Sequence, residues 1–491
     1  MAISFGDGRD GNLVVSSGTF NVNTDASGSR SYADGISYKV TSNPSSIFIT
    51  LGRQPNGLSI GDKILLINLQ GGDDDYDDVG NWEVLTIVDV QSTFVQVNSI
   101  PSMSYDGTTW SNQKVVIQRI PQYENVTISG GASITTCRWD RLSTTPSGPA
   151  GYYTGIISMF VSDTLTVYGS INAKYKGYAG GAQGGGGSVS YGYPGESTGK
   201  PNTSIGTSGN YILEGGGGAA FYPGSGGAGG GHGTNGMNGQ PNADVSSYIA
   251  YGAVAFGDEV LSRMNFGGGG SSAGFGPNGR YGVKGGYGGG IIYIHARTLN
   301  SYGIITSNGE VGATGVKVYD NNSGGGGGGG AGGTVYIKAY DIVGIGSSIT
   351  ANKGTGGPRD TAASKSKNGG DGGEGRIRVD YTKVNGVNWP NDTAINNIVD
   401  PNPYTVRLPY GWYYFSGHTN FLYDVPASGI KLYAYRRDNG SYMGTTTSSG
   451  DGGFEILTTY SGSHFLVALD DETGASYNDL VIGKIIPAYH S

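Results

Sequence analysis

Residues 324–333 read Gly-Gly-Gly-Gly-Gly-Gly-Gly-Ala-Gly-Gly and form one of five glycine blocks between Gly177 and Gly375. The blocks run, in chain order, over residues 180–187, 215–231, 267–290, 324–333 and 369–375. Glycine has no side chain to bury and loses more backbone entropy on ordering than any other residue, so the blocks cannot build an ordinary hydrophobic core. One interpretation is therefore a flexible linker.

Two features of this tract favour an ordered arrangement instead. Apolar, β-branched segments bracket the blocks, and aromatic residues lie inside the tract. Glycine runs can order as polyproline-II helices packed side by side, with N–H groups bonded to carbonyl groups of neighbouring helices. Such a polyglycine-II bundle satisfies the backbone without a hydrophobic interior. The strict three-residue period of collagen is absent, so the sequence does not predict a triple helix.

The composition is typical of a surface protein rather than a metabolic enzyme. Glycine supplies 94 of 491 residues, against a usual share of roughly 7%. Charged residues make up only 14%, and there are 35 tyrosines. The formal net charge of -8 argues against a nucleic-acid partner, which would need a basic face. The single cysteine, Cys137, excludes an intrachain disulfide framework and is expected to be a small buried side chain.

The N-terminus and the apolar pattern bear on location. The first residues, Met-Ala-Ile-Ser-Phe-Gly-Asp-Gly, lack the basic region and apolar run of a signal peptide. No stretch approaches the roughly 20 apolar residues that span a membrane, so we expect no membrane insertion. A surface-like composition without an export signal indicates a phage virion component, which host lysis would release.

A short strand–turn–strand phrase recurs along the chain. Its apolar positions lie six residues apart, in the pairs Val14/Phe20, Ile128/Ile134, Leu165/Ile171, Leu299/Ile305 and Val343/Ile349. A repeated unit that cannot bury its own apolar face must stack on its neighbours. We therefore expect a β-layer built from these repeats, with the glycine blocks emerging from one edge. Convergent turn chemistry in an all-β protein is the alternative.

The chain divides into regions of different texture. Residues 1–145 form an N-terminal β-domain whose closely spaced strands at about 45–120 predict a small β-barrel or sandwich. Residues 146–382 are the glycine-rich β-repeat domain, and residues 383–403 read as a linker. Residues 404–491 carry short alternating strands that predict an immunoglobulin-like or transthyretin-like β-sandwich. The predicted fold class is all-β, with repeated β-arch or strand units and a packed polyglycine-II helix bundle.

Two shorter segments leave alternatives open. The loop Asp73–Asp78 holds five carboxylates in six residues and could bind calcium, but its positions do not follow the EF-hand pattern, so a solvated acidic loop is favoured. Residues 248–264 could hold one short helix.

Two family resemblances follow from these residues. The blocks at 215–231, 267–290 and 324–333 resemble the glycine-rich regions of phage receptor-binding proteins, in particular the tail-tip adhesins of T-even-like phages. That resemblance implies a sandwich of polyproline-II helices, receptor contacts from the loops between motifs, and a monomeric tip. The β-repeat that frames the blocks is a departure from those adhesins. Residues 431–444, 452–456 and 465–471 resemble small β-sandwich modules of phage structural proteins, which serve as interaction or spacer domains.

No catalytic, metal or cofactor motif stands out. The histidines lack metal-ligand spacing, no G-x-S-x-G elbow occurs, and no glycine run continues into Gly-Lys-Ser/Thr. We therefore predict no enzymatic activity, no cofactor and no metal site. Carboxylates in the repeats could still assemble a glycosidase pair, which keeps a polysaccharide-depolymerising tailspike as an alternative. These carboxylates are Asp163, Glu310, Asp341 and Glu374.

The tract offers contact surface instead of chemistry. Tyrosine supplies rigid amphipathic area, and Gly, Ser and Asn loops supply adaptable hydrogen bonding. The candidate receptor contacts are aromatic residues between the blocks: Tyr191, Tyr193, Tyr211, Phe221, Tyr222, Phe275, Tyr281 and Tyr287. The alternative is that these rings pack against the bare glycine backbone.

We therefore expect a non-enzymatic protein of the virion surface, a tail-tip or fibre adhesin that binds a host cell-surface protein or polysaccharide. The N-terminal domain would attach it to other virion proteins, and a homo-trimer would suit a fibre. A capsid, collar or tail decoration protein is the structural alternative.

Overall fold

The computed structural model is an all-β structure. It describes residues 5–72, 74–144, 146, 148–183, 192–199, 215–220, 222–245, 249–274, 282–317, 324–343, 348–384 and 387–388, and then the strands between Thr405 and Tyr489 with short flanks. Within these ranges the regular elements are strands, apart from one 3-10 turn, η1 (Trp110–Asn112). The expected helix at 248–264 is wrong for its described residues, 249–264, which contain none. No described helix is long and apolar enough to cross a membrane.

Two parallel sheets form the framework of the molecule. The larger follows the order β1 (Leu13–Val15), β10 (Val126–Ile128), β12 (Ile156–Val167), β14 (Ile291–Ser301), β16 (Thr334–Val343) and β18 (Arg376–Val384), with β9 (Gln122–Tyr123), β19 (Val387–Asn388) and β20 (Thr405–Pro409) attached. The smaller follows β2 (Thr19–Asn21), β11 (Ser133–Thr135), β13 (Ser170–Asn172), β15 (Ile304–Thr306) and β17 (Ser348–Thr350). Strands β1, β10, β12, β14 and β16 of the larger sheet are each followed along the chain by a strand of the smaller sheet, so each of these five pairs is one rung of a stack.

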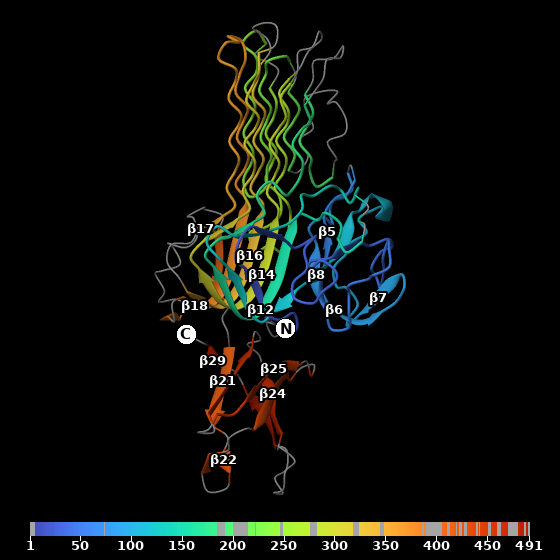
Figure 1. The fold of residues 1–491 in the computed structure, drawn as a ribbon, viewed down its shortest axis with the longest axis vertical. Coiled ribbons are helices and arrows are strands. Elements are labelled where there is room, and N and C mark those ends of the chain that lie inside the picture. Colours follow the sequence, from blue (N-terminus) through green and yellow to red (C-terminus); the bar gives the residue numbers. More distant parts are fainter. Residues whose placement is uncertain are drawn as a thin grey trace.

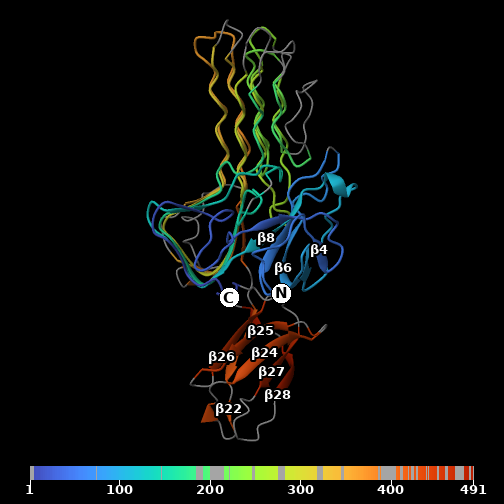
Figure 2. The ribbon, with the colours of Figure 1, turned by 45° about the vertical axis from the view of Figure 1, so that its right-hand side comes forward.

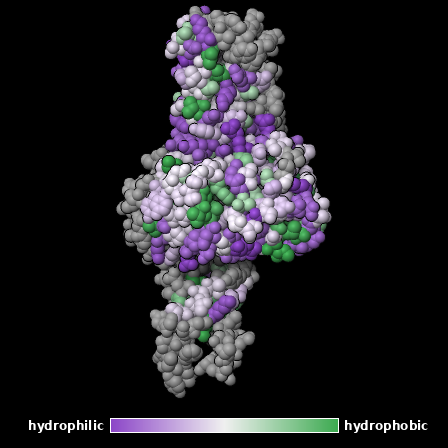
Figure 3. Space-filling view, viewed as in Figure 1, coloured by the Kyte–Doolittle hydropathy of each residue, from purple (hydrophilic) through white to green (hydrophobic). Residues whose placement is uncertain are grey.

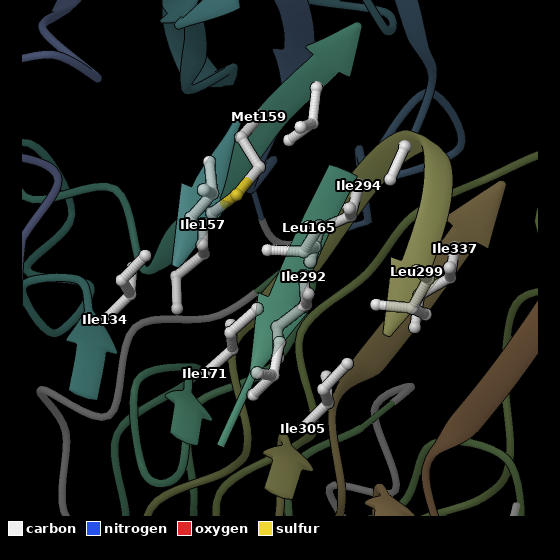
Figure 4. Packing of buried hydrophobic residues seen from close by; sticks show 14 of the residues in the cluster. Ile134, Ile157, Met159, Leu165, Ile171, Ile292, Ile294, Leu299, Ile305 and Ile337 are labelled. Atoms are coloured by element: carbon white, nitrogen blue, oxygen red, sulfur yellow. The ribbon is translucent and has the colours of Figure 1, made fainter. Parts of the chain in front are cut away.

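The rungs share one apolar core between the two sheets. Figure 4 shows Leu165, Ile292 and Leu299 of the larger sheet packed toward Ile171 and Ile305 of the smaller. Parallel strands in the same register place like residues in columns, so each rung covers the apolar face of the next. The predicted stacking of the repeats is what the sheets show.

The register corrects part of the predicted repeat. The second positions align as expected, with Phe20, Ile134, Ile171, Ile305 and Ile349 in one column. The first positions align as Leu13, Val126, Leu165, Leu299 and Ile342. Val14, Ile128 and Val343 are therefore out of that column, and Val14 is 65% exposed. The turns between the paired strands differ in length, so a constant six-residue spacing does not hold.

A closed antiparallel sheet is inserted between the first and second rungs. Its order is β3 (Ser37–Lys39), β8 (Val115–Ile120), β5 (Lys63–Asn68), β6 (Trp82–Val90), β7 (Phe94–Val97) and β4 (Phe48–Thr50). The chain after β3 bonds to the chain around β4, since the Thr41 amide donates to the Thr50 carbonyl and the Gly52 amide to the Lys39 carbonyl. These bonds close the sheet into a small barrel around its own apolar core.

A buried ionic cluster joins the barrel to the first rung. The Arg119 guanidinium of β8 lies 2.7 Å from Asp10 and 2.9 Å from Asp62, and all three side chains are almost fully buried. Burial alone would lower the pKa of Arg119, but these two carboxylates outweigh it and raise that pKa. Removing one partner of such a cluster strands the other charges in a dry interior, which is costly.

The C-terminal part consists of antiparallel strands. One sheet pairs β21 (Tyr413–His418) with β26 (Gly453–Thr458) and β29 (Ala488–Tyr489). Another follows β25 (Tyr442–Thr447), β24 (Lys431–Arg436), β27 (His464–Leu469) and β28 (Leu480–Ile485), and β22 (Asn420–Phe421) pairs with β23 (Val425–Pro426). The buried side chains Leu432, Met443, Ile456 and Leu466 come from both larger sheets. The strand β20 lies outside this unit, because it pairs with β18 of the framework.

The glycine blocks form a column of extended segments, which we call the glycine array. Figures 1 and 2 show it projecting from the parallel sheets at the end of the molecule opposite the C-terminal strands. Its described segments are residues 177–183, 192–199, 215–220, 224–233, 235–240, 250–257, 267–274, 282–290, 307–316, 324–333, 351–358 and 366–375. None of them is β-strand, yet almost all of their glycines are buried.

The parallel sheets set the order of the array. Segments 282–290, 324–333 and 366–375 lead directly into β14, β16 and β18, which are neighbours in the larger sheet. The segments are neighbours too, since Gly286 donates to Gly328 and Gly329 to Gly370. In the same way, segments 307–316 and 351–358 follow the neighbouring strands β15 and β17 and bond through the Gly309 amide.

Hydrogen bonds in the array repeat every three residues. Segment 267–274 shows the pattern. Its amides at 267, 270 and 273 donate to segment 282–290, and its amides at 268, 271 and 274 donate to segment 224–233. Its remaining amides, at 269 and 272, donate to segment 192–199. The carbonyls of the same segment accept from residues 177–183, 215–220 and 324–333. One segment therefore bonds to six neighbours, three through its amides and three through its carbonyls.

Segment 324–333 repeats this pattern. Its amides donate to residues 267–274, 307–316 and 366–375, and its carbonyls accept from residues 224–233, 282–290 and 351–358. The backbones lie so close that a Cβ on Gly270 would overlap the Gly328 carbonyl, and one on Gly326 would overlap the Gly357 carbonyl. Glycine is thus required by the close approach of neighbouring backbones.

A single methyl group tests this packing. We expect Gly270→Ala to lower the free energy of unfolding by about 3 kcal/mol, at the upper end of overpacking costs, because its Cβ would have to displace the Gly328 backbone. The matched control is Gly130→Ala in a rung turn, where nothing lies within 4 Å of the added Cβ. Thermal melting of both variants checks this, and equal melting temperatures would contradict close packing.

Candidate functional site: the distal end of the glycine array

Residues 359–365 join segments 351–358 and 366–375 at the end of the array farthest from the sheets. The described residues of that distal end are 222–224, 241–245, 249, 317 and 359–366. Figure 1 places these connections at the tip of the column. Inside the array the backbones of the segments bond to one another and leave little room for side chains. At the tip this close backbone packing ends, so larger side chains can be accommodated there.

The described tip residues form a polar network. The Asn242 side-chain amide donates to the Pro223 carbonyl at 2.8 Å, and Lys365 pairs with Asp244 at 2.6 Å. Arg359 donates to the carbonyls of Ser364 and Ser366 at 3.3 Å. These contacts join tip loops that are far apart in the sequence, so the described part of the tip is a connected surface.

Asp360 fastens two of these loops together. Its carboxylate accepts hydrogen bonds from the Lys317 amide at 2.7 Å and the Ala362 amide at 2.8 Å. These amide bonds, the Lys317 amide first, hold the pKa of Asp360 below its usual range. A carboxyl whose pKa is depressed by folding stabilises the fold above its unfolded pKa, so this fastening is lost only as the pH falls through the folded pKa.

The structure brings two predicted contact residues to this end. The Tyr193 amide donates to the Ser272 hydroxyl at 2.7 Å, and the Tyr193 carbonyl accepts from the Ser272 amide. Tyr222 lies in the turn before Ser225, and its backbone packs against Gly274. Both tyrosines are half-buried and adjoin the distal end of segment 267–274.

Tyr287 lies elsewhere, on the flank of the array near its base. The Arg138 guanidinium sits 3.8 Å from its ring centroid, and the Tyr287 amide and carbonyl both bond to Glu310. Its ring is engaged by a cation. The other candidates lie outside the described residues: Tyr191, Tyr211, Phe221, Phe275 and Tyr281.

Polar side chains terminate the array at its sides. Asn368, Asp371 and Glu374 accept hydrogen bonds from the amides of Arg359, Gly356 and Lys353 at 2.8, 2.8 and 2.9 Å. Both sets of residues are spaced by three, the period of the backbone bonds. Asn238 and Asn235 cap the amides of Gly252 and Ala255 in the same way. These side chains replace the neighbour that an edge segment lacks, as protective residues do at the edge of a β-sheet.

The sequence carries a signal for the edge segments of the array that the predictions above did not use. Residues 309–317 read Gly-Glu-Val-Gly-Ala-Thr-Gly-Val-Lys, a local Gly-x-x triplet, and residues 233–239 repeat the same spacing. Gly309, Gly312 and Gly315 are buried, while Val311 and Thr314 are exposed. The edge segments thus carry a local three-residue period, because only one of their faces meets the array.

The carboxylates considered for catalysis or calcium binding have structural partners in several cases. Glu374 caps the Lys353 amide, and Glu310 bonds to the Tyr287 amide at 3.2 Å and lies 3.4 Å from Lys284. In the acidic loop, Asp75 accepts from the amides of Thr108 and Thr109. Burial would raise the pKa of Asp75, but these bonds outweigh it and lower that pKa. Among the described residues no cluster of three His, Cys, Asp or Glu could hold a metal ion.

Comparison with known proteins gives only distant neighbours. No protein-family model matches the sequence, and no curated protein matches it. Three similar solved structures are phage tailspikes. The tailspike gp49 from Pseudomonas phage LKA1 has 8% sequence identity over 86% of this chain and 80% of its own, and Gp54 of Acinetobacter baumannii bacteriophage AP22, in complex with capsular saccharide, has 10% identity over 88% of this chain and 75% of its own. The tailspike gp61 of Pseudomonas phage phi297 has 11% identity over 94% of this chain and 86% of its own. Each has a TM-score of 0.15, too low for the likeness to carry an argument.

The edge caps lead to a test by substitution. In Asp371→Ala the Gly356 amide loses its acceptor, so we expect its hydrogen exchange to accelerate and the free energy of unfolding to fall by about 1 kcal/mol. Asp371→Asn keeps an acceptor oxygen and should retain most of the protection. Thr361→Ala, an exposed tip residue, is the control. Unchanged exchange at Gly356 in Asp371→Ala would show that the cap is unimportant.

Proposed function

We propose that this chain is a receptor-binding protein of a phage tail, which contacts the host surface through the distal end of the glycine array. The observation that carries the proposal is the three-residue hydrogen-bond pattern of the array. A column bonded in this way is a stiff spacer, and it holds the tip loops away from the rest of the molecule (Figure 1). Binding loops on a rigid scaffold are the usual arrangement of recognition sites.

The proposal includes a more specific interpretation of two parts of the fold, the array and the C-terminal strands. A three-residue period and bonds to six neighbours are what side-by-side polyglycine-II helices require. We therefore interpret the array as a polyglycine-II bundle and the C-terminal strands as an immunoglobulin-like module. In this arrangement the N-terminal domain attaches the chain to other virion proteins, and a trimer would pack through the framework rather than the tip.

The chemistry of the tip fits recognition without catalysis. Its described residues combine amides, hydroxyls and paired charges with half-buried tyrosines, which suits a host protein or a polysaccharide. Glu310 and Glu374, two of the carboxylates considered for glycoside cleavage, are engaged in the array instead. The proposal is accordingly a non-enzymatic adhesin.

Binding to cells tests the proposed surface. Fluorescent full-length protein is incubated with a panel of bacterial strains, and binding to a positive strain is compared with that of the Tyr193→Ala/Tyr222→Ala double variant. Loss of two aromatic contacts should weaken binding about tenfold or more. Tyr168→Ala is the matched control, because Tyr168 is 56% exposed on a rung turn. Protease or periodate treatment of the cells separates a protein receptor from a polysaccharide.

Two outcomes would contradict the proposal. If the folded tip variant binds as well as the wild type, or if Tyr168→Ala loses as much binding, the tip does not read the receptor. A fall in chain length of purified host polysaccharide on incubation with the protein would instead favour the depolymerising tailspike.

A further inference from the structure

A cavity of about 280 Å³ opens beside the N-terminal barrel, away from the array tip. The side chains that line it include Tyr32, Tyr38, Arg53, Gln54 and Asn56. It combines the half-buried Tyr32 ring, one guanidinium and two exposed amides, whereas the Tyr38 ring is only 1% exposed. Such a mixture of flat apolar area and convergent polar groups is typical of a small-ligand site.

Among the described residues the cation in this cavity, Arg53, has no carboxylate as counter-charge. The Arg53 guanidinium lies over the Tyr38 ring, 4.8 Å from its centroid, and 5.8 Å from that of Tyr152. It is held by backbone oxygen, since Nη2 donates to the Ala150 carbonyl at 2.7 Å and Nη1 to the Pro146 carbonyl at 3.5 Å. Among the described residues no carboxylate pairs with it, and its Nε is buried without a hydrogen-bond partner.

Some of the other side chains that line the cavity are held by contacts, and others are available to a ligand. The Tyr38 hydroxyl donates to the Asn56 carbonyl, which fixes that ring. The Tyr32 ring packs on Gly57, where a Cβ would overlap it. The side-chain amides of Gln54 and Asn56 are exposed and have no hydrogen-bond partner in the part of the chain that the structure describes. The cavity thus offers the half-buried Tyr32 ring, two free amides and a guanidinium that has no carboxylate partner among the described residues.

We propose that this cavity binds one carboxylate-bearing sugar unit, a uronic or sialic acid residue of a glycan. A guanidinium is the side chain best matched to a carboxylate. The half-buried Tyr32 ring presents flat apolar area to a sugar ring, and the free amides match its hydroxyl groups. A volume near the lower limit of about 300 Å³ for ligand pockets limits the occupant to a single unit. This site is separate from the tip and does not depend on the proposed adhesin function.

Titration of the full-length protein with free sugars tests the site. Glucuronate and N-acetylneuraminate are titrated by ligand-detected NMR, with glucose at the same concentrations as the neutral control. We expect one of the acidic sugars to bind with a dissociation constant in the millimolar range, typical of a single small site at about -4 kcal/mol. No acidic sugar binding up to about 10 mM, a limit near -3 kcal/mol, or binding of glucose alone, would overturn the proposal.

Two variants locate the binding in this cavity. Arg53→Gln removes the charge and should weaken the acidic sugar about tenfold. Gln54→Glu adds a carboxylate at the cavity without touching the Arg53 contacts, so it should weaken binding by repulsion even if Arg53→Gln fails to fold. The matched control is Gln91→Glu, the same change at an exposed barrel residue outside the cavity lining. If Gln54→Glu binds the acidic sugar as tightly as Gln91→Glu does, the cavity is not the site.

Discussion

The amide-to-carbonyl hydrogen bond between neighbouring glycine segments is the interaction on which the distal half of the molecule depends. The array has almost no apolar side chains to bury, so its segments are held by backbone bonds repeated every three residues. Unpaired backbone groups in so dense a column would be costly, and the pattern pairs most groups in the central segments with one of six neighbours. Glycine is needed at positions such as 270 and 326, where an added Cβ would overlap a neighbouring backbone.

The parallel framework gives this column its starting order. Apolar residues of stacked rungs, such as Leu165 over Leu299, fix the register of the sheets. Each rung is joined to an array segment that lies beside the segment of the neighbouring rung. The segments that precede β14, β16 and β18 therefore lie in the same order as these strands. A hydrophobic core thereby organises a part of the chain whose own apolar cluster is small, formed by Ala220, Ala228 and Ala250. The sides of the column are closed by Asn368, Asp371 and Glu374, and its outer flank is largely polar with separate apolar patches (Figure 3).

The sequence predicted the elements whose signal is local. The all-β class and the aligned column that includes Ile134 and Ile305 follow from apolar alternation and turn residues. The partner column was misplaced, because Val14 looks equivalent to Leu165 until the turn length is known. The Arg119 cluster could not be predicted, since Asp10 and Asp62 are distant in the sequence. At the candidate site, Tyr193 and Tyr222 lie near the distal ends of paired segments. Tyr287 lies on a segment that returns to the base of the array.

Native-state hydrogen exchange of the array amides tests the central claim most directly. If the segments are bonded as described, the amides of Gly268, Ser271, Gly328 and Ala331 should exchange as slowly as core amides of β14, because both need the same cooperative opening. Exchange of these glycine-tract amides at the rate of an unstructured chain, while the β14 amides stay protected, would contradict the account and make the tract a flexible linker.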